Sequence, residues 1–184
     1  MAPFFLPSTI TAHDGRRATV RKVRAADAPL VQQFVRGLSP RSRRSRFFGP
    51  VRELSPAQLE RMTRFDGSTG LGLAAVAGEG VPHIVAIAQH AMSDPPFAEL
   101  AVVVADDWQR QGVGERLVRM LLSYAAWTGI VAMHGLVAAA NQPMLALASK
   151  LGFAFEADAD PQLVRIEKPL GRLRSLAGWD RRSQ

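Results

Sequence analysis

The segment from Glu99 to Gly114 holds the residues best suited to chemistry. An apolar run ends in a short loop, and a turn with two glycines, Gly112 and Gly114, opens the next helix. The first N–H groups of a helix have no partner inside it and lie at the positive end of the helix dipole, so they attract phosphate. Glycine has no Cβ and lets a phosphate approach the backbone closely. With Arg110 adding positive charge, the segment predicts a pyrophosphate site, although two glycines also fit an ordinary strand-to-helix turn.

The sequence excludes several other kinds of site. A P-loop needs Gly-Lys before Ser or Thr, and this triplet is absent. A dinucleotide fingerprint needs a third glycine at the position of Leu117. The chain has no cysteine, so disulfides, thiolate metal sites and a cysteine nucleophile are excluded. The histidines lack the spacing of metal ligands, and no metal site is expected from them: His13, His83, His90 and His134.

The apolar runs before and after this segment predict a central sheet that positions it. Three apolar runs, 71–77, 84–91 and 97–104, are separated by turns. Each is apolar at both odd and even positions, which is typical of strands covered on both faces. A helix with apolar residues at helical spacing follows Gly112, and another buried strand is expected at 130–138.

Further elements flank this centre. A strand is expected at 17–23, followed by a helix with Asp27 as its N-cap and by two helices that begin at the Ser-Pro pairs of Ser39 and Ser55. Asn141 is expected to cap a short helix near the C-terminus, before two last strands at 153–155 and 163–166. We therefore expect a mixed α/β fold, a twisted sheet of about six to seven strands flanked by about four to five helices. The expected boundaries are a loosely ordered segment at 1–16, the domain at 17–168 and a basic tail at 169–184.

Two motifs in this order resemble the GCN5-related N-acetyltransferase (GNAT) family. The loop residues match its signature Q/R-x-x-G-x-G/A at every fixed position, and residues 141–153, which end in KLGF, are similar to its second motif. The resemblance implies the GNAT fold and acetyl-CoA as the acetyl donor. It implies that six consecutive residues hold the CoA pyrophosphate: Gln109, Arg110, Gln111, Gly112, Val113 and Gly114.

The same resemblance assigns further donor contacts. The strand that ends at Val104 would separate from the strand that starts near residue 130, and pantetheine would enter between them. Backbone groups of Val102 and Val104 would pair with pantetheine, and Asn141 would touch it. Lys150 would contact the nucleotide end of CoA, although a solvated lysine on a helix fits the sequence equally well.

Glu99 is the candidate general base. An amine must lose a proton to attack a thioester, and a lysine amine has a pKa near 10.4, so a positioned base is useful at neutral pH. Glu99 is the only carboxylate in the three central apolar runs, and we expect it to be partly buried. His90 is the second candidate base, although such a residue more often packs in a core. In the family, a tyrosine that protonates the leaving CoA thiolate often stands where this chain has Ala148, so here the thiolate would leave without a protein acid. The sole tyrosine, Tyr124, is expected to pack in the core.

An upstream segment indicates the acceptor. Residues 38–56, which contain LSPRSRRSRFFGP and ELSP, are similar to the acetyltransferase domain of bacterial protein lysine acetyltransferases. That resemblance implies transfer to a lysine side chain of a protein such as an acyl-CoA synthetase. The alternatives are a small-molecule amine as acceptor, a non-catalytic acetyl-CoA-binding module, or an arginine-rich nucleic-acid binder.

The charge distribution bears on the partner. The net charge is +7, and six arginines lie between Asp27 and Glu53 with no acid among them. Such a cluster attracts an acidic protein surface or is simply a solvated helix face. It holds few aromatic residues, which argues against nucleic acid. No stretch is long and apolar enough to predict a membrane span or a signal peptide, so a cytoplasmic protein is expected, and a homodimer is left open.

Overall fold

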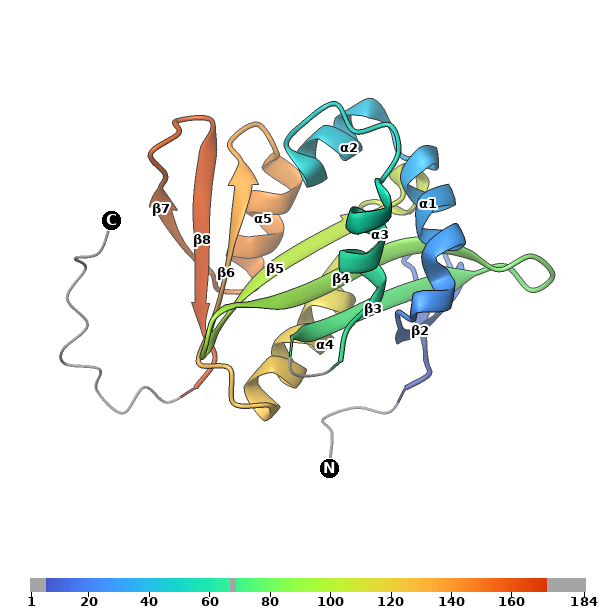
Figure 1. Cartoon of the computed structure of the whole chain (residues 1–184), viewed down its shortest axis with the longest axis horizontal. Coiled ribbons are helices and arrows are strands. Elements are labelled where there is room, and N and C mark those ends of the chain that lie inside the picture. The colour runs from blue at the N-terminus through green and yellow to red at the C-terminus, as the bar shows by residue number, and fades with distance from the viewer. Residues whose placement is uncertain (1–5, 67–68, 172–184) are drawn as a thin grey trace.

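One mixed sheet forms the centre of the molecule. The computed structural model describes residues 6–66 and 69–171, in which eight strands follow the order β1-β2-β3-β4-β5-β6-β8-β7 (Figure 1). Neighbouring strands are antiparallel except β5 and β6, which run parallel and are joined by the crossover helix α4. The strands are β1 (Ser8–Thr11), β2 (Arg17–Lys22), β3 (Gly70–Ala77), β4 (His83–Asp94), β5 (Phe97–Val104), β6 (Ala132–Ala138), β7 (Ala154–Ala157) and β8 (Leu163–Pro169).

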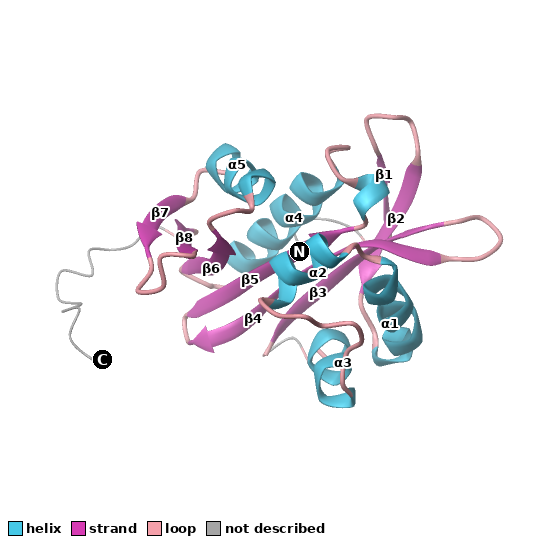
Figure 2. Ribbon diagram, turned by 90° about the horizontal axis from the view of Figure 1, so that it is seen from above, coloured by secondary structure: helices cyan, strands magenta, loops and turns pink. Residues whose placement is uncertain are grey.

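The helices cover the two faces of the sheet in separate groups. Figure 2 shows α1, α2 and α3 on one face and α4 and α5 on the other. The helices are α1 (Ala28–Gly37), α2 (Pro40–Phe47), α3 (Pro56–Thr63), α4 (Val113–Trp127) and α5 (Gln142–Lys150), with short 3₁₀ turns η1 (Ala25–Asp27) and η2 (Asp106–Trp108). The mixed α/β fold expected from the sequence, a central sheet flanked by helices, is confirmed.

Each face of the sheet has its own apolar core. The core under α4 includes the fully buried Leu117, Leu121 and Met133. The core under α1 and α3 includes Val31 and Ile87. Helix α2 contributes no fully buried side chain, and only Phe47 packs partly buried against the second core, so hydrogen bonds supply much of what holds it in place.

The N-terminal segment is more ordered than expected. Residues 8–11 form β1, which pairs with β2 and adds a strand to the expected number. Ile10 and Ala12 are buried in the core under α4. A four-residue edge strand carries too short a pattern to be detected in a sequence. The expectation of a loose segment is wrong for residues 8–16, whereas residues 1–5 and most of the basic tail, 172–184, lie outside the described residues.

Asp27 also differs from the prediction. It stands at the N-cap position of α1, but its side chain makes no capping hydrogen bond to that helix. Its carboxylate accepts two bonds from the Arg21 guanidinium, at 2.6 and 2.8 Å, and one from the Arg24 N–H at 2.8 Å. The hydrogen-bonded Arg21 holds the pKa of Asp27 below its usual value. Asp27 therefore ties the start of α1 to β2.

Candidate active site

Strands β5 and β6 run together briefly and then separate. Their ladder consists of three pairs: Phe97 with Ala132, Ala98 with Met133, and Glu99 with His134. Beyond Glu99, β5 continues to Val104 without pairing to β6 in the described residues, and β6 pairs with β8 along its length. The two strands form the walls of a fork, and Glu99 lies at its closed end (Figure 1).

In β5, the backbone N–H and C=O groups of every second residue face this fork. The Ala105 N–H donates to the Val85 carbonyl of the β4 side at 2.8 Å. Because backbone groups alternate in direction along a strand, those of Val102 and Val104 point away from β4 and toward the fork. The carbonyl of Val104 accepts a hydrogen bond from Gln109 Nε2 at 3.1 Å. Of the two expected pantetheine partners, Val104 therefore already uses its carbonyl within the protein.

The start of α4 meets the open end of the fork. Arg110 and Gly112 have φ values of 62° and 80°, and this left-handed conformation favours glycine. No side chain caps α4, so its first N–H groups can meet a ligand anion. A Cβ on Gly114 would lie 3.2 Å from Val104 Cγ2, so glycine lets the helix pack closely against β5. These features fit the pyrophosphate end of a CoA molecule.

The hairpin between β1 and β2 braces this loop. The His13 N–H donates to the Gln111 carbonyl at 3.1 Å, and the Asp14 N–H donates to Gln111 Oε1 at 3.0 Å. Arg16 forms an ion pair of 3.0 Å with Asp107. The side chain of Gln111, which was expected to contact the pyrophosphate, is therefore hydrogen-bonded to the hairpin.

A hydrogen-bonded network ties the loop to α2. Asp106 accepts from the Ser39 N–H at 2.8 Å, and from the hydroxyls of Ser39 and Ser42 at 2.7 Å each. Gln109 Nε2 donates to Ser42 Oγ at 3.1 Å. Burial acts to raise the pKa of Asp106, but the hydrogen bonds from Ser39 and Ser42 outweigh it and the pKa is lowered. We call Asp106, Ser39, Ser42 and Gln109 the Asp106 network.

Helix α5 presents the other two predicted donor residues. Asn141 caps this helix, as expected, by accepting from the Met144 N–H at 3.3 Å. Lys150 forms an ion pair of 2.6 Å with Glu115 on α4, which also pairs with Arg119 at 3.0 Å. Lys150 and then Arg119 hold the pKa of Glu115 below its usual value. The two expected CoA contacts thus have structural partners in this state.

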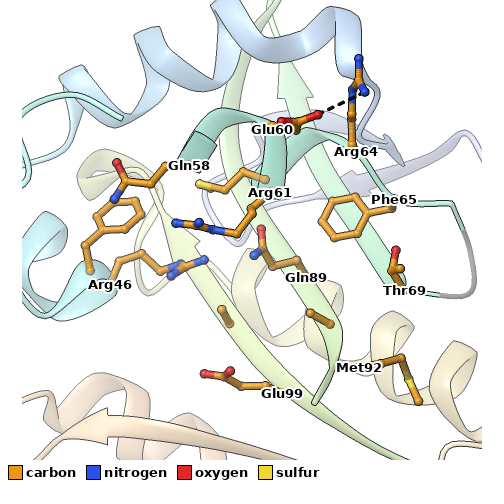
Figure 3. Close-up of a pocket in the computed structure, with 14 residues that line it drawn as sticks. Arg46, Gln58, Glu60, Arg61, Arg64, Phe65, Thr69, Gln89, Met92 and Glu99 are labelled. Atoms are coloured by element: carbon orange, nitrogen blue, oxygen red, sulfur yellow. Dashed lines mark ion pairs between the residues drawn. The ribbon is translucent and has the colours of Figure 1, made fainter. Parts of the chain in front are cut away.

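A pocket of about 610 Å³ opens on the face of the sheet that carries α2 and α3 (Figure 3). The two central strands supply its floor, and helices supply its rim. Residues from the floor are Gln89, Ala91, Met92, Glu99 and Ala101, and residues from the rim include Arg46, Phe47, Gln58, Glu60, Arg61, Met62, Arg64 and Phe65. Glu99 therefore belongs both to the fork and to this pocket.

The surroundings of Glu99 differ from the expectation in one respect. Its side chain is exposed to the pocket rather than partly buried. His134, its partner in the β5–β6 ladder, projects from the same face of the sheet because opposite residues of a parallel pair share a face. In the sequence, His134 is one of four dispersed histidines, and nothing there distinguishes it. Only the strand pairing places it beside Glu99.

His90 and Tyr124 lie on the other face. His90 alternates with the pocket residues Gln89 and Ala91 and is buried, 2% exposed, under α4. Burial lowers its pKa to about 4, and neither ring nitrogen has a hydrogen-bond partner in the described structure. The Tyr124 ring packs 6.2 Å from the His90 ring, as the expected packing role requires. His90 therefore cannot serve as the second candidate base at the pocket.

No three His, Asp or Glu side chains within residues 6–66 and 69–171 are grouped so that they could hold a metal ion. The same residues contain no helix long and apolar enough to cross a membrane.

Solved structures share this architecture. The GNAT domain of S. lividans PAT is 27% identical, with a TM-score of 0.81 over 89% of this chain and 96% of that chain. A GNAT superfamily phosphinothricin acetyltransferase from Sinorhizobium meliloti, solved with AcCoA, is 18% identical with a TM-score of 0.67, over 84% of this chain and 89% of that chain. At such low identity the second structure supports the fold alone.

Sequence comparisons reach the same group of proteins. The chain is 34% identical to Acetyltransferase PA5475 of Pseudomonas aeruginosa strain PAO1 over 149 residues, which is 80% of each protein. Residues 41–153 match the profile described as the Acetyltransferase (GNAT) family. That range contains the fork, the loop and the second motif. The chain is therefore an acetyltransferase and belongs to the GNAT family.

Proposed function

We propose that the protein transfers the acetyl group of acetyl-CoA to the ε-amine of a lysine in another protein. The observation that carries this proposal is the position of Glu99, at the closed end of the fork and on the floor of the pocket. The loop and the uncapped start of α4 would hold the pyrophosphate, and pantetheine would lie along the fork-facing backbone of Val102. The amine would come from the pocket side and meet the thioester near Glu99.

The transfer is a direct attack in a ternary complex. The amine nitrogen forms a bond to the acetyl carbonyl carbon, and the bond from that carbon to the CoA sulfur breaks. Glu99 accepts the proton that the amine loses. Ala148, which is fully buried, stands where the family often has a tyrosine that acts as general acid, so the leaving thiolate takes a proton from water.

A protein acceptor is favoured by the charge around the pocket. Arg41, Arg44 and Arg52 are exposed in the same segment of the chain as the rim residue Arg46, and they form no ion pair within the described residues. The resemblance of residues 38–56 to protein lysine acetyltransferases supports the same acceptor, and an acyl-CoA synthetase is the specific candidate. A small amine remains the second candidate, because a pocket of about 610 Å³ could hold one.

Labelled acetyl-CoA should test both candidates together. We would incubate the enzyme with acyl-CoA synthetases, lysine peptides and polyamines, and identify acetylated sites by mass spectrometry. We expect lysine acetylation in a protein at a higher kcat/KM than on any polyamine. Acetyl-CoA at a hundred times its Kd should also stabilise the fold by about 2.7 kcal/mol in thermal melts. Efficient acetylation of small amines with none on proteins would replace the proposal with the second candidate.

A further inference from the structure

The pocket holds opposite charges at two separate places. Glu60 and Arg64 on its rim pair with each other at 3.1 Å, so they satisfy one another. This leaves Arg46 and Arg61 on the helical side and Glu99 on the floor. None of these three forms an ion pair with another described residue. A ligand that fits this pocket should therefore carry both a positive and a negative group.

Arg46 is the less solvated of the two arginines. Its side chain is half-buried, and its guanidinium lies 5.0 Å from the centroid of the Phe47 ring. Burial lowers the pKa of Arg46, and the charge of Glu99 opposes that effect. A cation withdrawn from water without an ion-pair partner is costly, and an anion from a ligand would relieve the cost. Figure 3 shows the guanidinium of Arg61, from α3, directed toward that of Arg46.

Acceptor groups lie deeper, on the floor. Gln89 Oε1 is buried and has no hydrogen-bond partner in the described structure. Gln89 and Glu99 project from the same face of β4 and β5, because Gln89 pairs with Ala101 and Ala91 pairs with Glu99. An ammonium or amine has N–H donors for both oxygens. Buried acceptors normally have partners, and rotation of the Gln89 amide toward the pocket would let its oxygen accept from the acceptor amine.

We propose that this pocket selects a primary amine that carries a carboxylate beside it, as in a lysine next to Asp or Glu. The carboxylate lies between Arg46 and Arg61, and the amine meets Gln89 and Glu99. This selectivity rests on the proposed acetyl transfer and names the class of acceptor. It differs from attraction by the exposed arginines outside the pocket, because it depends on contact and persists in a short peptide.

Two matched peptides test the contact. Each has one lysine and a blocked N-terminus, flanked either by Glu on both sides or by Gln on both sides. The enzyme should prefer the Glu peptide in kcat/KM by roughly tenfold, which is the worth of one charge-assisted hydrogen bond. Arg46→Gln and Arg61→Gln should each reduce the ratio of kcat/KM between the Glu and Gln peptides severalfold, whatever change they cause in kcat/KM for the Gln peptide. Arg17→Gln removes an exposed arginine of β2 far from the pocket and should change neither value.

Two results would contradict the proposed carboxylate contact. Equal rates on both peptides with the unaltered enzyme would overturn the proposal. So would an equal loss on both peptides in Arg46→Gln, because the arginine would then serve Glu99 or the fold. Thermal melts of each variant check that the fold is retained.

The test also separates this inference from the proposed function. If no peptide or protein is acetylated, the lysine assignment fails, and the comparison moves to free lysine and cadaverine, which differ by the carboxylate. A preference for lysine that Arg46→Gln removes would uphold the carboxylate site for a small acceptor. Equal use of the two amines would overturn it.

Discussion

Glu99 belongs both to the β5–β6 ladder and to the pocket. It is the last residue of β5 to pair with β6, and its side chain lies on the floor of the pocket. The donor chain and the acceptor amine would therefore meet at this carboxylate from opposite sides of the sheet. Its role as base stays a prediction, and it can be tested without disturbing the fold because the side chain is exposed.

Replacing Glu99 with Gln keeps the shape and removes the proton acceptor. We expect kcat to fall by roughly 10²–10⁴-fold, the usual worth of general base catalysis. The Kd for acetyl-CoA should not change, and the loss in kcat should shrink at high pH, where more of the amine is already deprotonated. Rates from pH 6 to 10 and calorimetric titration with acetyl-CoA provide the measurements. An unchanged kcat at pH 7 would move the base elsewhere, and His134→Gln would then be the next variant.

At this scale the sequence identified some residues and missed others. Glu99 and the glycines stood out because a carboxylate is rare in a buried strand and a glycine pair is typical of a tight turn. Arg46 was one of six arginines in a polar stretch, and its place in the pocket depends on how α2 packs. His90, the second candidate base, is buried on the other face of the sheet, whereas His134 pairs with Glu99. Only the strand pairing and the strand face show which histidine lies beside Glu99.

Among the five α-helices of the described structure, α2 has the least apolar support. It has no buried side chain, and the Asp106 network fixes its first turn to the end of β5. Arg43 adds two hydrogen bonds from its guanidinium, to the carbonyls of Arg36 and Leu38, at 3.0 and 2.7 Å. The helix that carries Arg46 is therefore positioned by the same loop that would hold the donor.

The bond between α1 and β2 gives a pH-dependent contribution to stability. The pKa of Asp27 is lowered in the folded state, so its contribution is present above the unfolded pKa near 3.8 and is lost as the pH falls through the folded value. Asp27→Asn should reduce the free energy of unfolding at pH 7 by about 1.5–3 kcal/mol, the worth of hydrogen bonds to a charged group.

Urea denaturation at several pH values would measure this difference. The gap between Asp27→Asn and the parent should start to narrow as the pH falls below about 3.8 and should close once the pH passes the lower folded pKa, where the parent carboxylate is protonated as well. Glu60→Gln is a suitable control, since it breaks an exposed pair on α3 and should cost at most about 1 kcal/mol. A constant gap at every pH would show that shape, rather than charge, makes Asp27 important.

Most elements followed from the sequence because their patterns were long. The central strands and α4 have extended apolar runs, and Ser39, Ser55 and Asn141 each cap a helix as expected. The capping role of Asp27 was wrong because a nearby guanidinium competes for the carboxylate. No local pattern reveals such a partner from a neighbouring strand.

At the scale of the whole molecule, the proposed function has the donor and the acceptor reach Glu99 from different sides of the sheet. The loop and the start of α4 lie at one end of the fork, whereas the pocket, with Arg46 of α2 on its rim, opens on the face that carries α2 and α3 (Figure 3). Part of the net charge of +7 lies on this side of the sheet, because Arg41, Arg44 and Arg52 are exposed in and just after α2. Such a field speeds the approach of an acidic protein.

Reversal of charge at Arg41 and Arg44 tests this steering. Both side chains are exposed, and unlike Arg43 they form no hydrogen bond to α1 in the described structure. The double change Arg41→Glu and Arg44→Glu should raise KM for an acidic protein acceptor severalfold with little effect on kcat. The effect should weaken between 0.1 and 1 M salt, as the Debye length falls from about 10 to about 3 Å.

A lysine peptide with Gln neighbours is the control for this double variant. It is too small to cover the patch, so its kcat/KM should stay within about twofold at either salt concentration. Equal losses for the protein and the peptide would mean that the two arginines support the active site itself rather than the approach of a partner.

The fork has a final consequence, for hydrogen exchange along β5. The amides of Ala101 and Val103 face β4 and are locked in an antiparallel ladder, whereas those of Val102 and Val104 face the gap that β6 leaves. Without ligand, deuterium should enter alternate residues of one strand at different rates, although all four belong to the same element. A pantetheine chain along the gap would act as a missing strand and make the protection uniform. In this fold, ligand binding thus completes the sheet.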